Sequence, residues 1–143
     1  AVRLLRKKVP NFKFEIIGDG KFREEIEKDF NVLGFQKNSE KYFSKYHFAF
    51  VSRYLSIMEA IAARRLVFAV YDNPLKEDYL RMAPFSKFIN IIGNIDKLSS
   101  SVLYFTKYPD KEKIMIDRAF NWVKNQTWDN VRDIYLNLWN KNK

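Results

Sequence analysis

Cysteine is absent from this sequence of 143 residues, and histidine occurs once, as His47. The absence of cysteine excludes a disulfide scaffold, a thiol nucleophile and a zinc site built on thiolates. A single imidazole also excludes a metal site with several histidine ligands. No run of apolar residues approaches the ~18 that a membrane-spanning helix needs. From these absences we expect a soluble, cytoplasmic protein.

Basic residues outnumber acidic ones, 26 against 17, which gives a formal net charge of +9. Hydrophobic residues make up 47% of the chain and charged residues 30%, which is the mix of a folded globular domain. At ~100–200 residues per domain, we expect residues 1–143 to form a single domain. The chain opens with Val2, Leu4 and Leu5 beside basic residues, a pattern typical of the last turns of an amphipathic helix. We therefore expect the sequence to be part of a longer polypeptide.

Apolar segments alternate with segments of helical periodicity along most of the chain. The near-continuous apolar runs at 47–51 and 66–70 predict buried strands, because strands of a parallel sheet are covered on both faces. The alternation predicts an α/β fold, with a parallel sheet between two layers of helices and a helical C-terminal tail. The other expected strands are 12–17, 31–35 and 88–92, and the expected helices are 21–29, 39–46, 55–64, 96–108, 110–125 and a last one capped by Thr127.

Ligands of open parallel sheets bind beyond the carboxyl ends of the strands, so the turns at those ends are candidate sites. Gly18 and Gly20 form a Gly-Asp-Gly turn after the first strand, where backbone without a side chain can approach a ligand closely. The alternative is an ordinary tight turn between a strand and a helix. The pattern is neither a dinucleotide-binding fingerprint nor a phosphate-binding P-loop.

The segment from Ser52 to Leu55 precedes the most apolar helix expected in the chain. Free N–H groups at the start of such a helix suit a phosphate, and Arg53 can add a planar guanidinium. Glu59 lies one turn into this helix among apolar neighbours, where an ionised carboxylate is costly unless a partner satisfies it. A ribose can do so by donating both of its hydroxyls. The alternative is a glutamate that faces solvent on a half-exposed helix.

These segments, in their order, resemble the donor-binding C-terminal half of retaining GT-B glycosyltransferases of the family-4 (group 1) type. The resemblance covers nearly the whole chain. It is carried by residues 14–20 with Gly-Asp-Gly, 31–36 with Leu-Gly-Phe, 48–52 with Phe-Val-Ser, 57–70 with Met-Glu-Ala-Ile-Ala, and by Trp128 with residues 135–139.

The resemblance implies a Rossmann-like domain that binds a nucleotide sugar in a cleft between two halves of a larger enzyme, which transfers the sugar to an acceptor. It implies no cofactor and no metal, and the sequence contains no Asp-x-Asp motif. Glu59 matches the glutamate that binds the donor ribose. The other implied donor-binding residues are Gly18 and Gly20 at the glycine turn, Gly34, Phe35 and Gln36 near the base, and Leu55 and Ser56, with Ser52 and Arg53 before them, at the diphosphate.

Departures from the family pattern also bear on function. Val51 stands where the family has a first glutamate, eight positions before the second, so the catalytic residues are unknown. The family's central first strand, between the segments 12–17 and 48–51, has no counterpart, and neither does the acceptor-binding N-terminal half. We expect the segments 12–17 and 48–51 to be parallel strands, either separated by a gap or newly paired. We also expect Glu59 to point toward the cleft, and these residues alone to be inactive.

The basic residues leave other functions open. A net positive charge can attract nucleic acid, but no aromatic RNA-binding strand signature is present, so nucleic acid is not the expected partner. An anionic membrane surface is the preferred macromolecular partner, through peripheral contact. A merely basic domain is the simpler alternative. Two other functions also stay open: a non-catalytic, glycosyltransferase-like binding or scaffold module, and a basic α/β module that binds nucleic acid.

Overall fold

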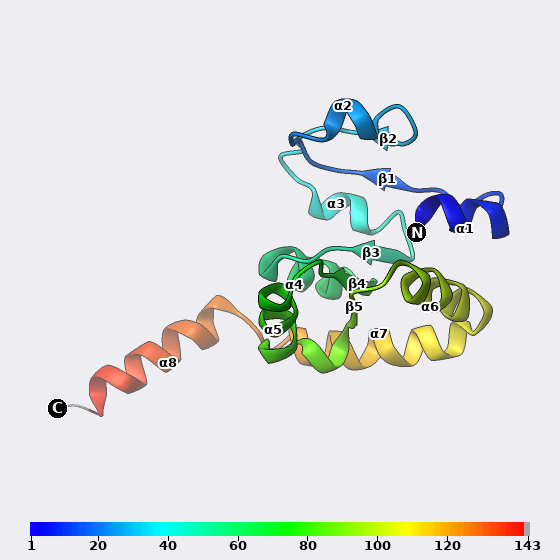
Figure 1. The fold of residues 1–143 in the computed structure, drawn as a ribbon. Helices are drawn as coiled ribbons and strands as arrows, with labels where there is room; N and C mark the ends of the chain where they lie inside the picture. The colour runs from blue at the N-terminus through cyan, green and yellow to red at the C-terminus, as the bar shows by residue number, and fades with distance from the viewer. Residues whose placement is uncertain (142–143) are drawn as a thin grey trace.

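The computed structural model of the protein describes residues 1–141. Helices and strands alternate along most of the chain, as the sequence predicts (Figure 1). In chain order the elements are α1 (Val2–Lys8), β1 (Glu15–Ile16), α2 (Arg23–Ile26), β2 (Asn31–Val32), α3 (Glu40–Phe43), β3 (Phe48–Phe50), α4 (Tyr54–Ala62), β4 (Leu66–Val70), α5 (Pro74–Met82), the 3₁₀ turn η1 (Ser86–Phe88), β5 (Asn90–Ile92), α6 (Ile95–Lys107), α7 (Pro109–Val123) and α8 (Trp128–Asn140).

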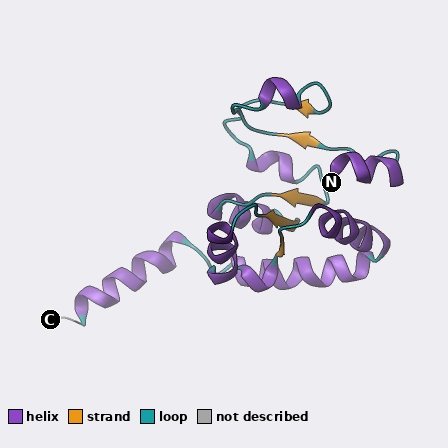
Figure 2. Cartoon of the chain, in the orientation of Figure 1, coloured by secondary structure: helices purple, strands orange, loops and turns teal. Residues whose placement is uncertain are grey.

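The strands form two small parallel sheets instead of the single sheet expected from the sequence. The first sheet pairs β1 with β2, and the second has the order β3–β4–β5. In Figure 2 the arrows of β1 and β3 point in the same direction, yet the two strands are not paired. Of the two arrangements expected for these strands, the structure therefore has the one with a gap between them.

The three-stranded sheet is covered by helices on both faces. Val67 and Ala69 of β4 pack in one apolar cluster with residues of α4 and α7. Leu66 and Phe68, which point to the opposite face, pack in a second cluster with Leu5 of α1 and residues of α6. This division follows from the alternation of side chains along a strand. The chain is therefore an α/β protein whose larger sheet lies between two layers of helices, as in a Rossmann-like fold.

Several expected elements have the predicted type and nearly the predicted bounds. The strand at Leu66–Val70 agrees at both ends, and α4, α6 and α7 each agree within two residues. Thr127 caps α8, because its side chain accepts a hydrogen bond from the N–H of Asn130 at 3.2 Å.

Other predictions were wrong in extent or missed an element. The strand expected at 12–17 is reduced to Glu15–Ile16, and the helix expected at 21–29 to Arg23–Ile26. The helix expected at 39–46 is the single turn α3, and Ser39 precedes it without a capping hydrogen bond. The prediction also missed α5, where the Asn73 side chain caps the helix and Pro74 occupies its first turn. An Asn-Pro pair is a known helix-start signal.

The last helix, α8, extends away from the rest of the molecule (Figure 1). None of its residues is buried, and exposed apolar side chains include Trp128, Ile134, Tyr135 and Trp139. Across residues 1–141, no helix combines the length and the apolar composition required to cross a membrane.

Candidate functional site

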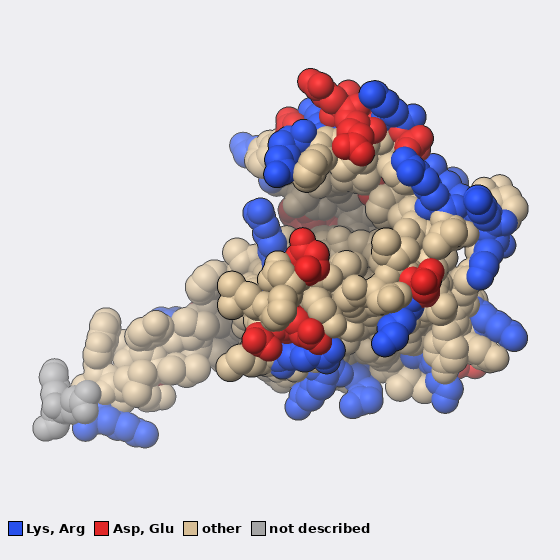
Figure 3. Space-filling view, viewed as in Figure 1, with Lys and Arg blue, Asp and Glu red and all other residues tan. Residues whose placement is uncertain are grey.

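A cavity of about 910 Å³ lies between β1 and β3. In the space-filling view a hollow separates the segment that carries β1 and β2 from the main body (Figure 3). The cavity runs along both strands, from Lys13 and His47 at their amino ends to Gly18 and Arg53 beyond their carboxyl ends. Its volume is at the upper end of the range of small-molecule sites.

Six of the residues singled out in the sequence line this one cavity, although they come from three separate stretches of the chain. They lie toward the carboxyl ends of the strands, where parallel α/β sheets bind ligands. These residues are Gly18, Phe35, Gln36, Arg53, Ser56 and Glu59.

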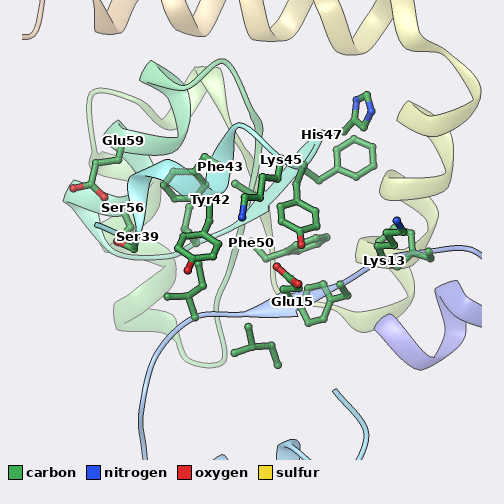
Figure 4. A pocket seen from close by; sticks show the side chains of 18 of the residues that line it. Lys13, Glu15, Ser39, Tyr42, Phe43, Lys45, His47, Phe50, Ser56 and Glu59 are labelled. Atoms are coloured by element: carbon green, nitrogen blue, oxygen red, sulfur yellow. The ribbon is translucent and has the colours of Figure 1, made fainter. Parts of the chain in front are cut away.

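Helix α4 carries Ser56 and Glu59 on the same face, because residues three apart are neighbours on a helix. The opposite face, with Ile57, Ala60 and Ile61, is buried in the core and fixes the rotation of the helix. Figure 4 shows Ser56 and Glu59 at one end of the cavity, and Lys13 and His47 at the other. The Glu59 side chain is exposed, so its carboxylate is free to accept hydrogen bonds from a ligand.

The loop after β2 supplies an aromatic ring and an amide to the cavity. Phe35 is 81% exposed, which is unusual for a phenylalanine and leaves its ring face free for stacking. Gln36 is held in place at both ends of its amide. Its Nε2 donates to the Leu33 carbonyl at 2.7 Å, and its Oε1 accepts from the Tyr42 hydroxyl at 2.9 Å. This loop is therefore fixed around Gln36 while Phe35 stays accessible.

Arg53 lies between β3 and α4, directly before the first residue of α4. Its backbone is extended, and its side chain makes no capping hydrogen bond to the helix. The exposed guanidinium is therefore available to an anion at the start of α4.

Four predicted residues are not among those that line the cavity. The Ser52 hydroxyl accepts from the N–H of Val70 and donates to its carbonyl, both at 2.9 Å, so it ties the ends of β3 and β4 together. Leu55 is 64% exposed. Gly34 is buried with a φ of +68° beside the Arg23 guanidinium, and Gly20 lines a smaller hollow of about 310 Å³ next to Gly18.

The sequence analysis missed several polar and aromatic residues that line the cavity. Lys45 and Tyr42 lie above it and Glu15 lies below it in Figure 4. The Lys45 ammonium is 4.5 Å from the centre of the Tyr42 ring, a cation–π contact. The aromatic and basic residues between 41 and 46 are the signal that could have identified this wall.

Tyr46 lies on the same wall and is held as a neutral phenol. Burial, together with hydrogen bonding to the Glu15 carboxylate, raises the pKa of Tyr46 to about 12. Glu15 is also held by the side-chain amide of Asn31, which donates to it at 3.1 Å. Glu15 of β1 and Tyr46, just before β3, both line the cavity.

At the amino end of β3, Glu112 and His47 approach each other, with 3.8 Å between Glu112 Oε1 and His47 Nδ1. Burial raises the pKa of Glu112, and the charges of His47 and Arg65 oppose this rise. The His47 side chain itself is largely exposed.

No cluster of three or more residues able to ligate a metal occurs within residues 1–141. Comparison of the sequence with protein-family models finds no match, and comparison with curated proteins finds none either.

Proposed function

We propose that the chain binds a nucleotide sugar and is the donor-binding half of a GT-B glycosyltransferase. The observation that carries the proposal is the convergence of Gly18, Phe35, Gln36, Arg53, Ser56 and Glu59 on one cavity.

The chemistry of the lining residues suits each part of a nucleotide sugar. Glu59 accepts hydrogen bonds from the two ribose hydroxyls, because an ionised carboxylate can only accept. Arg53 offers a guanidinium to the diphosphate, and Lys45 adds a second positive charge on the adjacent wall. Phe35 stacks on the base, which needs an accessible aromatic face. In this proposal the sugar transfer itself also requires an acceptor-binding half.

A non-catalytic binding module is the second candidate function. Val51 lines the cavity at the position where a first glutamate is expected beside the transferred sugar. A valine there provides no carboxylate to act on the sugar. Such a module binds the nucleotide without transferring the sugar, so it shares the binding site and differs in the reaction.

The test is a thermal-shift screen of the chain with UDP, GDP and ADP and their sugars. A ligand at 100 times its dissociation constant stabilises the folded state by ~2.7 kcal/mol, which a melting curve resolves. We expect one nucleotide to raise the Tm and the rise to be lost in Glu59→Ala. Glu24→Ala, which removes an exposed glutamate of α2 outside the cavity, is the matched control and keeps the full response.

Three other results bear on the alternatives. The absence of a shift with every nucleotide contradicts the donor-binding proposal. Salt-dependent retention on heparin or RNA with no nucleotide effect favours a nucleic-acid-binding module instead. Nucleotide binding without hydrolysis or transfer of the sugar by the full polypeptide favours the non-catalytic module.

A further inference from the structure

The turn between β3 and α4 has one side toward the cavity and one side away from it. Val51 and Arg53 line the cavity, whereas Ser52, the residue between them, does not. The Ser52 hydroxyl is bonded instead to the backbone of Val70, the last residue of β4. Successive side chains of an extended segment point in opposite directions, so the Ser52 side of the turn faces the connection from β4 to α5.

Lys76, in the first turn of α5, reaches the same turn from the side away from the cavity. Its ammonium donates a hydrogen bond to the Ser52 carbonyl and lies 4.4 Å from the centre of the Tyr79 ring. The backbone N–H of Lys76 donates to the Asn73 side chain at 2.9 Å, which fixes the start of α5. In Figure 1, α5 lies beside α4. The Ser52 residue is therefore held by β4 through its hydroxyl and by α5 through its carbonyl.

The Lys76 ammonium has no carboxylate to hold it in another place. Within residues 1–141 it forms no ion pair, and the neighbouring Glu77 is paired with Arg81 at 2.6 Å. A charged donor makes a stronger hydrogen bond than a neutral one, and a half-buried carbonyl that loses its partner is costly. The bond from Lys76 to the Ser52 carbonyl therefore contributes to the position of the turn.

The direction of the Arg53 side chain depends on this turn. Arg53 has an extended backbone, and its side chain makes no capping hydrogen bond to α4. Its carbonyl accepts the first hydrogen bond of α4, from the N–H of Ile57 at 2.9 Å. A shift of the peptide between Ser52 and Arg53 would therefore move both the guanidinium and the first turn of α4.

We propose that Lys76 and Ser52 are positioning residues of the candidate site, which hold the turn so that Arg53 stays directed into the cavity. Lys76 acts through Arg53 and not by contact with the ligand, because Lys76 does not line the cavity. The link to ligand binding rests on the proposed function, in which Arg53 offers its guanidinium to the diphosphate. The hold on the turn does not depend on any ligand, so the two parts are tested separately.

The first measurement is amide hydrogen exchange in the chain without ligand. Lys76→Met keeps the length of the side chain and removes the donor. We expect exchange at the Ile57 amide to become about tenfold faster in this variant, because the first turn of α4 opens more readily. Leu98 is the internal control, since its N–H makes the corresponding first bond of α6, to the Asn94 carbonyl at 3.0 Å, and its exchange should not change.

Two further variants separate the hydrogen bond from a general effect of substitution. Lys76→Arg retains a charged donor for the Ser52 carbonyl, and exchange at Ile57 should return to within about twofold of the unmodified chain. Lys124→Met is the matched control, because it removes an exposed lysine that follows α7 and does not line the cavity. It should leave exchange at Ile57 unchanged.

The second measurement is the Kd of UDP, GDP and ADP by titration calorimetry. For a nucleotide that binds, Lys76→Met should raise the Kd about tenfold and Lys76→Arg should restore most of the affinity. In the Arg53→Ala background, Lys76→Met should change the Kd by less than about twofold, because the effect passes through a side chain that is already gone.

Unchanged exchange at Ile57 in Lys76→Met overturns the proposal, whether or not a nucleotide binds. Failure of Lys76→Arg to restore the slow exchange also overturns it. A loss of affinity that is as large with Arg53→Ala as without it does the same, because it shows that Lys76 acts on the ligand or on the whole fold. If none of the three nucleotides binds, the proposed function fails, and exchange at Ile57 still decides whether Lys76 holds the turn.

Discussion

Residues 49–123 contain every buried apolar side chain of the described chain except Leu5, whereas among residues 10–48 only Gly34 is buried. Both segments contain parallel strands and aromatic residues, so composition alone does not explain the difference. In the later segment, the sheet β3–β4–β5 has helices on both faces. In the earlier one, a two-stranded sheet has a cavity along one edge. Such a pair of strands is marginally stable by itself.

The earlier segment is held by a small number of contacts that reach across to its neighbours. Phe14 meets Phe30 and Phe50, with ring centres 5.8 Å and 5.6 Å apart, and Arg6 of α1 lies over the Phe30 ring at 5.0 Å. The candidate site therefore lies between residues 49–123, which form the buried core, and residues 10–48, which are held by few contacts. A ligand bound in the cavity would contact both.

The largest expected effect is that of Phe68→Ala in the packed body. Phe68 is completely buried on the central strand, and its ring contacts those of Phe48, Phe50 and Phe105. Removal of a fully buried phenylalanine ring costs about 3–5 kcal/mol of the free energy of unfolding, which urea denaturation measures. The matched control is Phe22→Ala in the other segment, where the ring is 56% exposed and the expected change stays within ~0.5 kcal/mol. Equal losses for the two variants would break the comparison.

Gly93→Ala should have the next largest effect. A Cβ at Gly93, just after β5, would overlap the ring of Tyr71. We expect a loss of about 1–3 kcal/mol in the free energy of unfolding, as for other overpacked positions. In the Tyr71→Ala background, Gly93→Ala should cost much less, because the ring it meets is gone.

Gly20→Ala is the matched control for this prediction. No atom lies within 4 Å of a Cβ at Gly20, and its φ is not in the left-handed region. Its free energy of unfolding should therefore change little. A loss at Gly20 as large as that at Gly93 would show that the earlier segment is packed as tightly as the later one.

Limited proteolysis should show a smaller difference between the two segments, in the rate at which trypsin cuts each of them. Trypsin should cut between Lys21 and Lys45 first, because local opening of this segment requires less free energy than opening of the sheet β3–β4–β5. We expect these sites to be cut about tenfold faster than Arg64 and Arg65, which follow α4; mass spectrometry of the early fragments measures this. First cleavage at Arg64 or Arg65 would contradict the order of stability inferred here.

The same difference explains how much the sequence could predict. The run Leu66–Val70 is apolar at every position because both faces of β4 are covered, so its bounds could be read directly from the sequence. The segment 12–17 is aromatic and β-branched, yet only Glu15–Ile16 is paired. Strand length depends on partners, and its second edge has none among the described residues, so propensity alone predicted too long a strand.

The candidate site shows the same limit. Glu59 was predicted at the site from its apolar neighbours and a family resemblance, and it lines the cavity because Ile57, Ala60 and Ile61 bury the opposite face of α4. Ser52 was predicted from its place before a helix, but its hydroxyl bonds to the backbone of Val70, a partner distant in sequence. Lys45 and Tyr42 line the cavity from a single helical turn and the residues just after it, whose weak periodicity does not show which side chains face the cavity. Residues such as Ser52, whose partners are distant in sequence, could not be placed from the local pattern.

The smallest expected effect is the pH dependence that Glu112 gives to the free energy of unfolding. Glu112 of α7 lies beside His47, where the two segments meet. Burial raises the pKa of Glu112 in the folded state, so the folded chain binds this proton more tightly than the unfolded chain does. The resulting stabilisation is fully present below the ordinary glutamate pKa and is lost as pH rises through the raised value. At pH 7 the partly buried carboxylate therefore weakens folding.

Glu112→Gln should raise the free energy of unfolding by about 0.5 kcal/mol at pH 7, with the difference shrinking toward zero at pH 4. Urea denaturation at both pH values measures this, with Glu24→Gln as the exposed control that changes little at either. A loss of stability in Glu112→Gln at pH 7 would mean that the attraction between the Glu112 carboxylate and His47 is stronger than the cost of burying that carboxylate.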